Sequence, residues 1–320
     1  MNELSENSLA DLISRLREQI CRVILGQEIV IDQVLAALLA GGHVLLEGKP
    51  GLGKTHLVNT LARTFGGHSA RIQFTPDLMP SDVTGFRLFD MQSQTFQLRQ
   101  GPIFTNLLLA DEINRAPAKT QSALLEVMQE MQVTIDGETL RLTPPFMTLA
   151  TQNPVEHEGT YPLPEAQLDR FVMKLVMDYP AAQAECEIVR RAAAETAGGE
   201  RQAVAIVCGP QDIIAAQQAT AATQVVPEVV AYAVALAKAT RESHSISLGA
   251  GTRGAISLVK IGKAFAALAG RGFVTPDDIK QAALPVLRHR VQLTPEVAIS
   301  GQGVDEVLQA IIECVAAPRQ

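Results

Sequence analysis

The sequence predicts an α/β fold, in which an αβα domain on a five-stranded parallel sheet precedes a smaller all-helical domain. As far as Pro180, short apolar runs alternate with helical patterns, which is typical of a parallel sheet with helices on both faces. Beyond Pro180 the strand-like runs nearly vanish and the chain becomes rich in alanine. Hydrophobic residues make up 47% of the 320 residues, enough for a substantial core. We therefore expect the first domain at residues 1–182 and the helical domain at residues 183–320.

The elements of the first domain follow in the order that this fold requires. Two helical patterns come first, at residues 8–24 and 28–41. Five short, mainly apolar runs follow, and each has the length and composition of a strand. We expect these strands at residues 43–48, 70–74, 105–112, 147–154 and 171–179.

Two segments interrupt the alternation of strands and helices. Residues 85–103 alternate like a hairpin inside what should be a helical connection. Residues 132–145 form a second predicted hairpin, with Asp136-Gly137 as its turn. In the second domain we expect helices that are separated at AGGE, CGP, LGAGTRG, GRGFVTP and LTP.

A glycine-rich loop joins the first strand to the helix after it. Its sequence GKPGLGKT, residues 48–55, fits the pattern G-x-x-x-x-G-K-[ST]. Glycines allow several backbone N–H groups to point into one hollow at a helix N-terminus, where phosphate binds. We expect Lys54 to reach the β- and γ-phosphates and the Thr55 hydroxyl to ligate Mg²⁺. The predicted nucleotide contacts are Gly48, Pro50, Gly51, Leu52, Gly53, Lys54, Thr55 and His56.

Acidic and polar side chains follow two of the predicted strands. Asp111 and Glu112 emerge at the carboxyl end of the third strand, where open parallel sheets place their ligands. We expect Asp111 to hold Mg²⁺ with Thr55, and Glu112 to orient and deprotonate the water that attacks the γ-phosphate. Asn153 ends the fourth strand and would lie beside the γ-phosphate and that water. These residues predict hydrolysis of ATP with Mg²⁺ as the metal.

Composition argues against several other classes of protein. The net charge of −7 and the isoelectric point near 5.5 argue against nucleic acid as the main partner. The four cysteines lie far apart without a CxxC pair, which favours reduced thiols over a zinc site or disulfides. The scattered histidines form no metal-binding pattern, so no metal beyond Mg²⁺ is expected. Without a signal peptide or an apolar run long enough for a transmembrane segment, we expect a soluble, cytoplasmic protein.

Several motifs together resemble those of the AAA+ ATPases and, within them, of the MoxR family. They are the glycine-rich loop, LLLADEINRAP, ATQNP and LPEAQLDRF, and RIQFTPDLMPSDVTG and ALLEVMQE also match. The resemblance covers nearly the whole chain. It implies a P-loop αβα AAA+ core with two inserted hairpins and a helical lid. It also implies ring oligomers, commonly hexamers, with ATP at the subunit boundaries.

The same resemblance implies roles for single residues. Arg170, in LDRF, matches the arginine finger that reaches into the neighbouring subunit's site. The residues alone would favour a surface arginine that pairs with Asp169 instead. Arg253, in GAGTRGAIS, matches the sensor arginine of the lid, which would contact ATP in its own chain. Gln27, in VILGQEIV, matches the segment near the adenine.

The resemblance implies a ring that hydrolyses ATP to remodel or mature other proteins. MoxR-like proteins are associated with partners that carry a von Willebrand factor A domain, which would here be a separate chain. The two hairpins would contact such a partner, or else they pack on the sheet. The main alternative is a nucleic-acid-associated AAA+ motor or loader, which would need a basic stripe that this sequence lacks. A regulatory scaffold with little turnover would have no need of Glu112.

Overall fold

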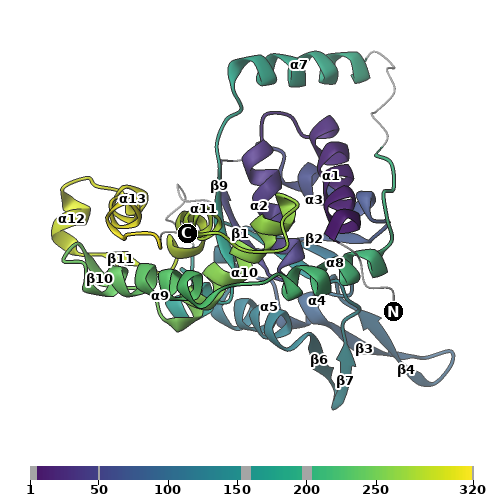
Figure 1. The fold of residues 1–320 in the computed structure, drawn as a ribbon. Coiled ribbons are helices and arrows are strands. Elements are labelled where there is room, and N and C mark those ends of the chain that lie inside the picture. The colour runs from purple at the N-terminus through teal and green to yellow at the C-terminus, as the bar shows by residue number, and fades with distance from the viewer. Residues whose placement is uncertain (1–5, 50, 153–159, 197–203, 319–320) are drawn as a thin grey trace.

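A five-stranded parallel sheet lies at the centre of the protein (Figure 1). The computed structural model describes residues 6–49, 51–152, 160–196 and 204–318. The strand order is β2-β5-β8-β1-β9, and every neighbouring pair is parallel. Each strand overlaps a run predicted from the sequence, so this prediction is confirmed. The strands are β1 (Val44–Gly48), β2 (Ser69–Gln73), β5 (Leu107–Asp111), β8 (Met147–Gln152) and β9 (Met173–Met177).

Alternate residues of the strands enter two separate hydrophobic clusters, as the pleat of a strand requires. Val44 and Leu46 of β1 belong to one cluster and Leu45 to the other. Helices cover both faces, with three on the first and two on the second (Figure 1). They are α1 (Glu6–Val23), α2 (Glu28–Leu39) and α3 (Lys54–Thr64), then α4 (Pro80–Thr84) and α5 (Ala118–Glu130).

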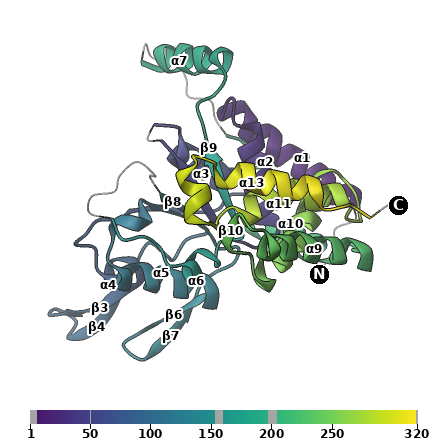
Figure 2. The ribbon, with the colours of Figure 1, turned by 90° about the vertical axis from the view of Figure 1, so that its left-hand side faces the viewer.

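Both predicted hairpins are present, and they project from the same side of the sheet (Figures 1 and 2). In the second hairpin Asp136 and Gly137 have φ values of 48° and 84°, as a tight turn with two left-handed residues requires. The first hairpin pairs β3 (Gly85–Asp90) with β4 (Thr95–Gln100), and the second pairs β6 (Gln132–Ile135) with β7 (Glu138–Arg141). The 3-10 helix η1 (Ile113–Arg115) and the short helix α6 (Glu165–Leu168) complete this part of the chain.

The C-terminal region is helical, as predicted. Four of its helices begin with a proline, which has the backbone angle of a first helical position and needs no N–H partner there. A short antiparallel pair, β10 (Ile246–Leu248) with β11 (Gln292–Leu293), differs from the all-helical expectation because so few residues leave no periodic pattern. The helices are α7 (Ala182–Thr196), α8 (Pro210–Ala222), α9 (Pro227–Glu242), α10 (Thr252–Leu268), α11 (Pro276–Leu287), α12 (Pro295–Ile299) and α13 (Val304–Cys314).

Helices α8 to α11 and α13 share one hydrophobic cluster with α1, α2 and α3. Helix α10 packs directly on α2 and α1, so the helical region lies against the helices that cover the first face of the sheet. Helix α7 lies at one end of the molecule in both views, and its Arg191 donates to the Arg22 carbonyl of α1 at 2.8 Å (Figures 1 and 2). The division at residues 182 and 183 remains a prediction. Among the described helices, none combines the length and hydrophobicity that a membrane span needs.

Candidate functional site

The glycine-rich loop follows β1 and leads into α3, as predicted. Gly51 and Gly53 have φ values of 86° and 84°, a region that side-chain-bearing residues rarely adopt. Gly48 is required for a different reason, because a Cβ there would lie 2.7 Å from the Met177 carbonyl oxygen on β9. The loop therefore turns sharply against the sheet and presents backbone N–H groups at the N-terminus of α3. Pro50 lies outside the described residues.

Lys54 begins α3 and turns back over the loop. Its Nζ donates a hydrogen bond to the Gly48 carbonyl at 2.5 Å. Burial lowers the pKa of Lys54, and the nearby carboxylates of Asp111, Glu112 and Glu47 partly offset this effect. The ammonium group is thus held between the loop and the acidic strand end. In the same first helical turn, the side chain of Thr55 is half-buried and that of His56 is exposed.

Asp111 ends β5 and accepts hydrogen bonds on both carboxylate oxygens. The Thr151 hydroxyl, on β8, donates to Oδ1 at 2.6 Å. Arg71, on β2, donates to Oδ2 from Nη2 at 2.6 Å and from Nε at 3.1 Å. The two strands that flank β5 therefore each supply one partner and fix the orientation of the carboxylate.

Glu112 follows directly but has different partners. Its backbone is left-handed, with φ 56° and ψ 50°, which costs on the order of 1–2 kcal/mol for a residue with a side chain. Its Oε2 accepts from Gln73 Nε2 at 2.8 Å and from Arg115 Nη1 at 2.9 Å. Strain of this size at a strand end is characteristic of functional sites. The two adjacent acids therefore have different hydrogen-bond partners.

Sequence reasoning missed three of the residues that hold these two acids. Arg71 and Gln73 come from β2, and Thr151 comes from the run ATQNP that supplied Asn153. Their proximity depends on the parallel register, in which Gln73 lies opposite Asp111. A polar residue at the end of an otherwise apolar strand was the available signal for Thr151. Asn153 itself lies outside the described residues, since β8 ends at Gln152.

Gln27 lies at the same carboxyl edge of the sheet. Its side-chain Nε2 donates to the Asp178 carbonyl, just after β9, at 2.8 Å. Beside it, Lys49 Nζ of the glycine-rich loop lies 4.9 Å from the centre of the Tyr179 ring. Gln27 thus joins the segment before α2 to the chain that runs alongside the loop. This position suits a contact with the nucleotide base.

Arg170 and Arg253 lie at the opposite, amino edge of the sheet. The Val172 N–H donates to the His43 carbonyl at 2.8 Å, where β1 and β9 are about to begin. The two arginines line one surface cavity of about 280 Å³ there, and no described residue of the glycine-rich loop lines it. Five residues of strand separate the two edges, on the order of 16 Å.

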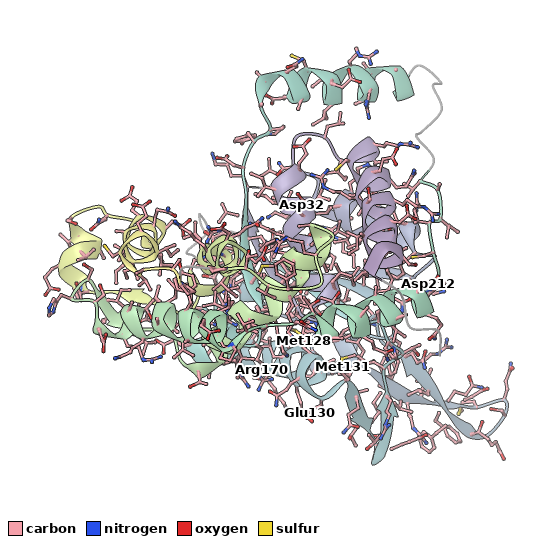
Figure 3. All side chains as sticks on the ribbon, in the orientation of Figure 1. Asp32, Met128, Glu130, Met131, Arg170 and Asp212 are labelled. Atoms are coloured by element: carbon pink, nitrogen blue, oxygen red, sulfur yellow. The ribbon has the colours of Figure 1, made fainter. Side chains whose placement is uncertain are left out.

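The side chain of Arg170 makes no hydrogen bond or ion pair with any described residue. The alternative in which it pairs with Asp169 is wrong, because Asp169 pairs with Arg290 and Arg253 instead. Arg170 also lines a second open cavity, of about 510 Å³, together with Glu126 and Glu130 of α5. Figure 3 shows Arg170 beside Glu130, next to the end of α5. The guanidinium is therefore available to a group outside this chain.

The first hairpin carries apolar side chains into solvent. The aromatic rings of Phe89 and Phe96 contact each other edge to face, with centroids 5.2 Å apart, and both remain exposed. Arg87 and Glu138 form an ion pair that joins the first hairpin to the second. The alternative in which the hairpins simply pack on the sheet does not account for these exposed residues. The exposed apolar residues of the first hairpin are Phe86, Leu88, Phe89, Met91 and Phe96.

A glycine-rich loop between β1 and α3, together with two acids at the carboxyl end of β5, defines a P-loop nucleotide-binding domain, and the helical region follows it as a lid. Comparisons with known proteins agree. Residues 43–173 match the model of the ATPase family associated with various cellular activities (AAA), and residues 238–311 match that of an AAA lid domain.

Individual relatives identify the family within the AAA ATPases. The chain is 40% identical to Chaperone MoxR1 of Mycobacterium tuberculosis, over 94% of this chain and 81% of that protein. It is 44% identical to the uncharacterized protein YeaC of Bacillus subtilis and 30% identical to Protein MoxR of Methylorubrum extorquens, over 96% or more of each chain. A crystal structure of a candidate ATPase from Cytophaga hutchinsonii matches with a TM-score of 0.91 at 40% identity, covering 98% of this chain and 97% of that one. The protein belongs to the MoxR family of AAA+ ATPases.

Proposed function

We propose that this protein hydrolyses ATP to ADP and phosphate in a ring, at sites that two neighbouring subunits complete together. The separation of the polar residues into two groups carries this proposal. The glycine-rich loop, Asp111 and Glu112 lie at the carboxyl edge of the sheet, whereas Arg170 and Arg253 lie at the amino edge. Neither arginine is placed to reach a nucleotide on its own chain. Both would instead act on a nucleotide bound by a neighbour.

Within one chain, the residues at the carboxyl edge have separate tasks. Backbone N–H groups of the loop and the ammonium of Lys54 bind the phosphates. Glu112 accepts a proton from the attacking water, while Gln73 and Arg115 fix the direction of its carboxylate. Asn153 would orient the same water from the end of β8. Gln27, beside Asp178, contacts the base.

Mg²⁺ is the cofactor that this set of side chains fits. The Thr55 hydroxyl and the Asp111 carboxylate are hard oxygen donors, which Mg²⁺ prefers. Both oxygens of Asp111 already accept hydrogen bonds, an arrangement that suits contact with the ion through water. Thr55 and Asp111 would hold the ion, which would neutralise charge that develops on the phosphate oxygens.

We infer that Arg170 is the arginine finger of the ring. A guanidinium that enters the neighbour's site stabilises charge on the transferred phosphoryl group and can raise kcat by roughly 10³-fold or more. The free side chain of Arg170 and its open cavity support this role. Arg253 lines the same edge cavity, so we place its sensor function in the neighbour's site too, rather than in its own chain. A heterologous contact of this kind closes into a ring, for which we propose six subunits.

The ring would act on other proteins. Support comes from the relative named Chaperone MoxR1 and from the exposed apolar side chains of the first hairpin. Exposed apolar groups of this kind mark interaction sites. We propose a client or adaptor with a von Willebrand factor A domain as the partner. Hydrolysis would then drive remodelling or maturation of that partner, in a cytoplasm where the free cysteines stay reduced.

A nucleic-acid motor or loader has less support. Arg87 is paired with Glu138, and Arg290 is buried against Asp169. Arg288 is mostly buried and pairs with Asp305. These charges are not available to a phosphate backbone. Absence of DNA or RNA binding at low salt would separate the two functions.

The decisive experiment is ATP turnover against protein concentration, with mass measured by light scattering. Specific activity should rise as oligomers form, because each site needs a neighbour. Arg170→Ala should bind ATP normally but lose turnover by roughly 10³-fold. A specific activity that is independent of concentration, with an unimpaired Arg170→Ala variant, would show that sites are complete within one chain.

A further inference from the structure

The short segment between α6 and β9 carries Arg170. Arg290 of the lid forms hydrogen bonds to this segment. Arg290 lies just after α11, and its guanidinium forms hydrogen bonds to three residues of this segment. Nε donates to Asp169 Oδ1 at 2.7 Å, Nη2 donates to the Phe171 carbonyl at 2.7 Å, and Nη1 donates to the Val172 carbonyl at 3.3 Å. The residues on both sides of Arg170 are therefore attached to one lid side chain.

The same guanidinium is fixed within the lid. Nη2 donates to the Ser257 hydroxyl of α10 at 3.2 Å, and Nη1 donates to the Val286 carbonyl of α11. Next to it, His289 Nε2 lies 3.0 Å from the Phe171 carbonyl oxygen, and donates to it in the neutral tautomer that this contact favours. Arg290 thus links α10 and α11 to the chain around the finger, and the five N–H donors of an arginine suit that task.

Burial shows that this contact is more than a surface ion pair. The side chain of Arg290 is 3% exposed, whereas that of Asp169 is 30% exposed. Enclosing a guanidinium costs several kcal/mol, and apolar side chains would hold two packed elements together as well or better. Apolar side chains form no directional bonds, whereas the guanidinium fixes the direction of three backbone and side-chain oxygens.

Arg170 differs from its neighbours in this segment. Its side chain has no described partner and faces the cavity beside Glu130 (Figure 3). The backbone on either side is fixed, and only the guanidinium is left to reach outward. A misplacement of about 1 Å at a group of this kind can cost 10²-fold in rate.

We propose that Arg290 is a positioning residue for the arginine finger, and that it couples the place of Arg170 to the lid of the same subunit. This inference rests on the proposed function of Arg170 in the neighbour's site. Movement of the lid then moves the finger that serves the adjacent nucleotide. One side chain would transmit the state of one subunit to the site of the next.

The test uses Arg290→Ala in the full-length protein. We expect kcat to fall by about 10²-fold, while nucleotide affinity changes by less than about twofold, because the subunit's own loop is untouched. Arg290→Lys keeps the charge but lacks the planar fork, so it should recover only part of the lost kcat. Equal effects of Arg290→Ala on affinity and kcat would contradict a positioning role.

The matched control is Arg271→Ala. Arg271 also pairs with a buried lid carboxylate, Asp278, at 2.6 Å, but it does not touch the segment around Arg170. Its loss should lower the stability of the lid while turnover per assembled ring stays near that of the wild type. If Arg271→Ala lowers turnover as much as Arg290→Ala, general damage to the lid explains both.

Mixed rings show in which subunit the defect acts. Lys54→Ala subunits bind nucleotide poorly but keep an intact finger. Mixed in equal amounts with Arg290→Ala, they should restore turnover to roughly a quarter of the wild-type value, since about one boundary in four joins an intact loop to an intact finger. No recovery would place the defect in the subunit's own site and overturn the inference.

The Arg170→Ala variant, mixed with Lys54→Ala in the same way, tests the proposed finger separately from the inference about Arg290. Recovery there but not with Arg290→Ala overturns only the inference about Arg290. No recovery with Arg170→Ala overturns the proposed finger, and with it the inference. Should Arg290→Ala fail to assemble, Asp169→Asn breaks the same ion pair from its more exposed side and is mixed instead.

Discussion

Thr151 donates its hydroxyl proton to Asp111 Oδ1 at 2.6 Å, and the same hydroxyl oxygen accepts the backbone N–H of Glu112 at 2.8 Å. One side chain of β8 therefore orients both acids at the end of β5. It holds the carboxylate of the first and the strained backbone of the second. Because Thr151 also precedes Asn153 by two residues, it connects the two strand ends that face the P-loop.

Thr151→Val keeps the shape of the side chain and removes this bridge. The Asp111 oxygen and the Glu112 N–H would each lose a partner, which costs about 1–3 kcal/mol of the free energy of unfolding. Turnover should fall by about 10- to 100-fold, as is usual when the partner of a metal-binding side chain is removed. Urea unfolding and steady-state ATPase assays measure the two effects.

Thr148→Val is the matched control on the same strand. Thr148 is fully buried, and its hydroxyl has no hydrogen-bond partner in the described structure. Replacing that hydroxyl with a methyl group should leave stability unchanged or raise it, with turnover unchanged. If both substitutions lower turnover alike, the effect of Thr151→Val comes from repacking of β8 rather than from the bridge.

Glu112→Gln should separate binding from hydrolysis. The amide keeps the size of the side chain and can still interact with Gln73, but it cannot take a proton from water. We expect nucleotide affinity within about threefold of the wild type and a fall in kcat of roughly 10²- to 10⁴-fold. Calorimetric titration with ATP and single-turnover kinetics test this pair of outcomes. A variant with normal kcat would exclude Glu112 as the base.

Arg253→Ala tests on which nucleotide the lid arginine acts. From its place beside Arg170, we expect the variant to lose turnover and to recover it when mixed with Lys54→Ala. The motif alone suggested contact with ATP in the same chain, and in that case the mixed rings would stay inactive. Measuring turnover over a series of mixing ratios distinguishes the two, because only action across the boundary gives a maximum at intermediate ratios.

The elements of this fold could be predicted because each one leaves a local pattern. Alternating apolar residues, glycines at turns and prolines at helix starts act over a few positions. The P-loop residues and the acid pair Asp111 and Glu112 were predicted for the same reason, since loop and strand tip are contiguous in sequence.

What the sequence did not reveal depends on contacts between distant segments. Arg71 reaches Asp111 only because β2 and β5 pair in parallel register. Arg290 reaches Asp169 across 121 positions of the chain. Arg253 lies at its edge of the sheet because of how the lid packs on α2 and α1. No local sequence pattern indicates that packing.

His43 links stability to pH. Burial lowers its pKa from 6.5 to about 4. Its Nδ1 accepts the Thr148 N–H at 3.0 Å and its Nε2 lies 2.9 Å from the Met128 carbonyl oxygen, so the neutral ring is the form that fits. Between pH 6.5 and 4 the unfolded chain binds a proton that the folded chain does not. The free energy of unfolding should therefore fall as pH falls through this window, by up to about 3 kcal/mol from His43.

His43→Gln tests this dependence. Burial also lowers the pKa of His289 well below its ordinary value, so His43→Gln should remove only part of the decline. Urea unfolding at a series of pH values between 4 and 7 gives the slope for each variant. His244→Gln, at an exposed position, is the control and should leave the slope as it is. An unchanged slope in His43→Gln would mean that His43 takes up its proton in the folded protein. The hydrogen bond from the Thr148 N–H would then break on protonation.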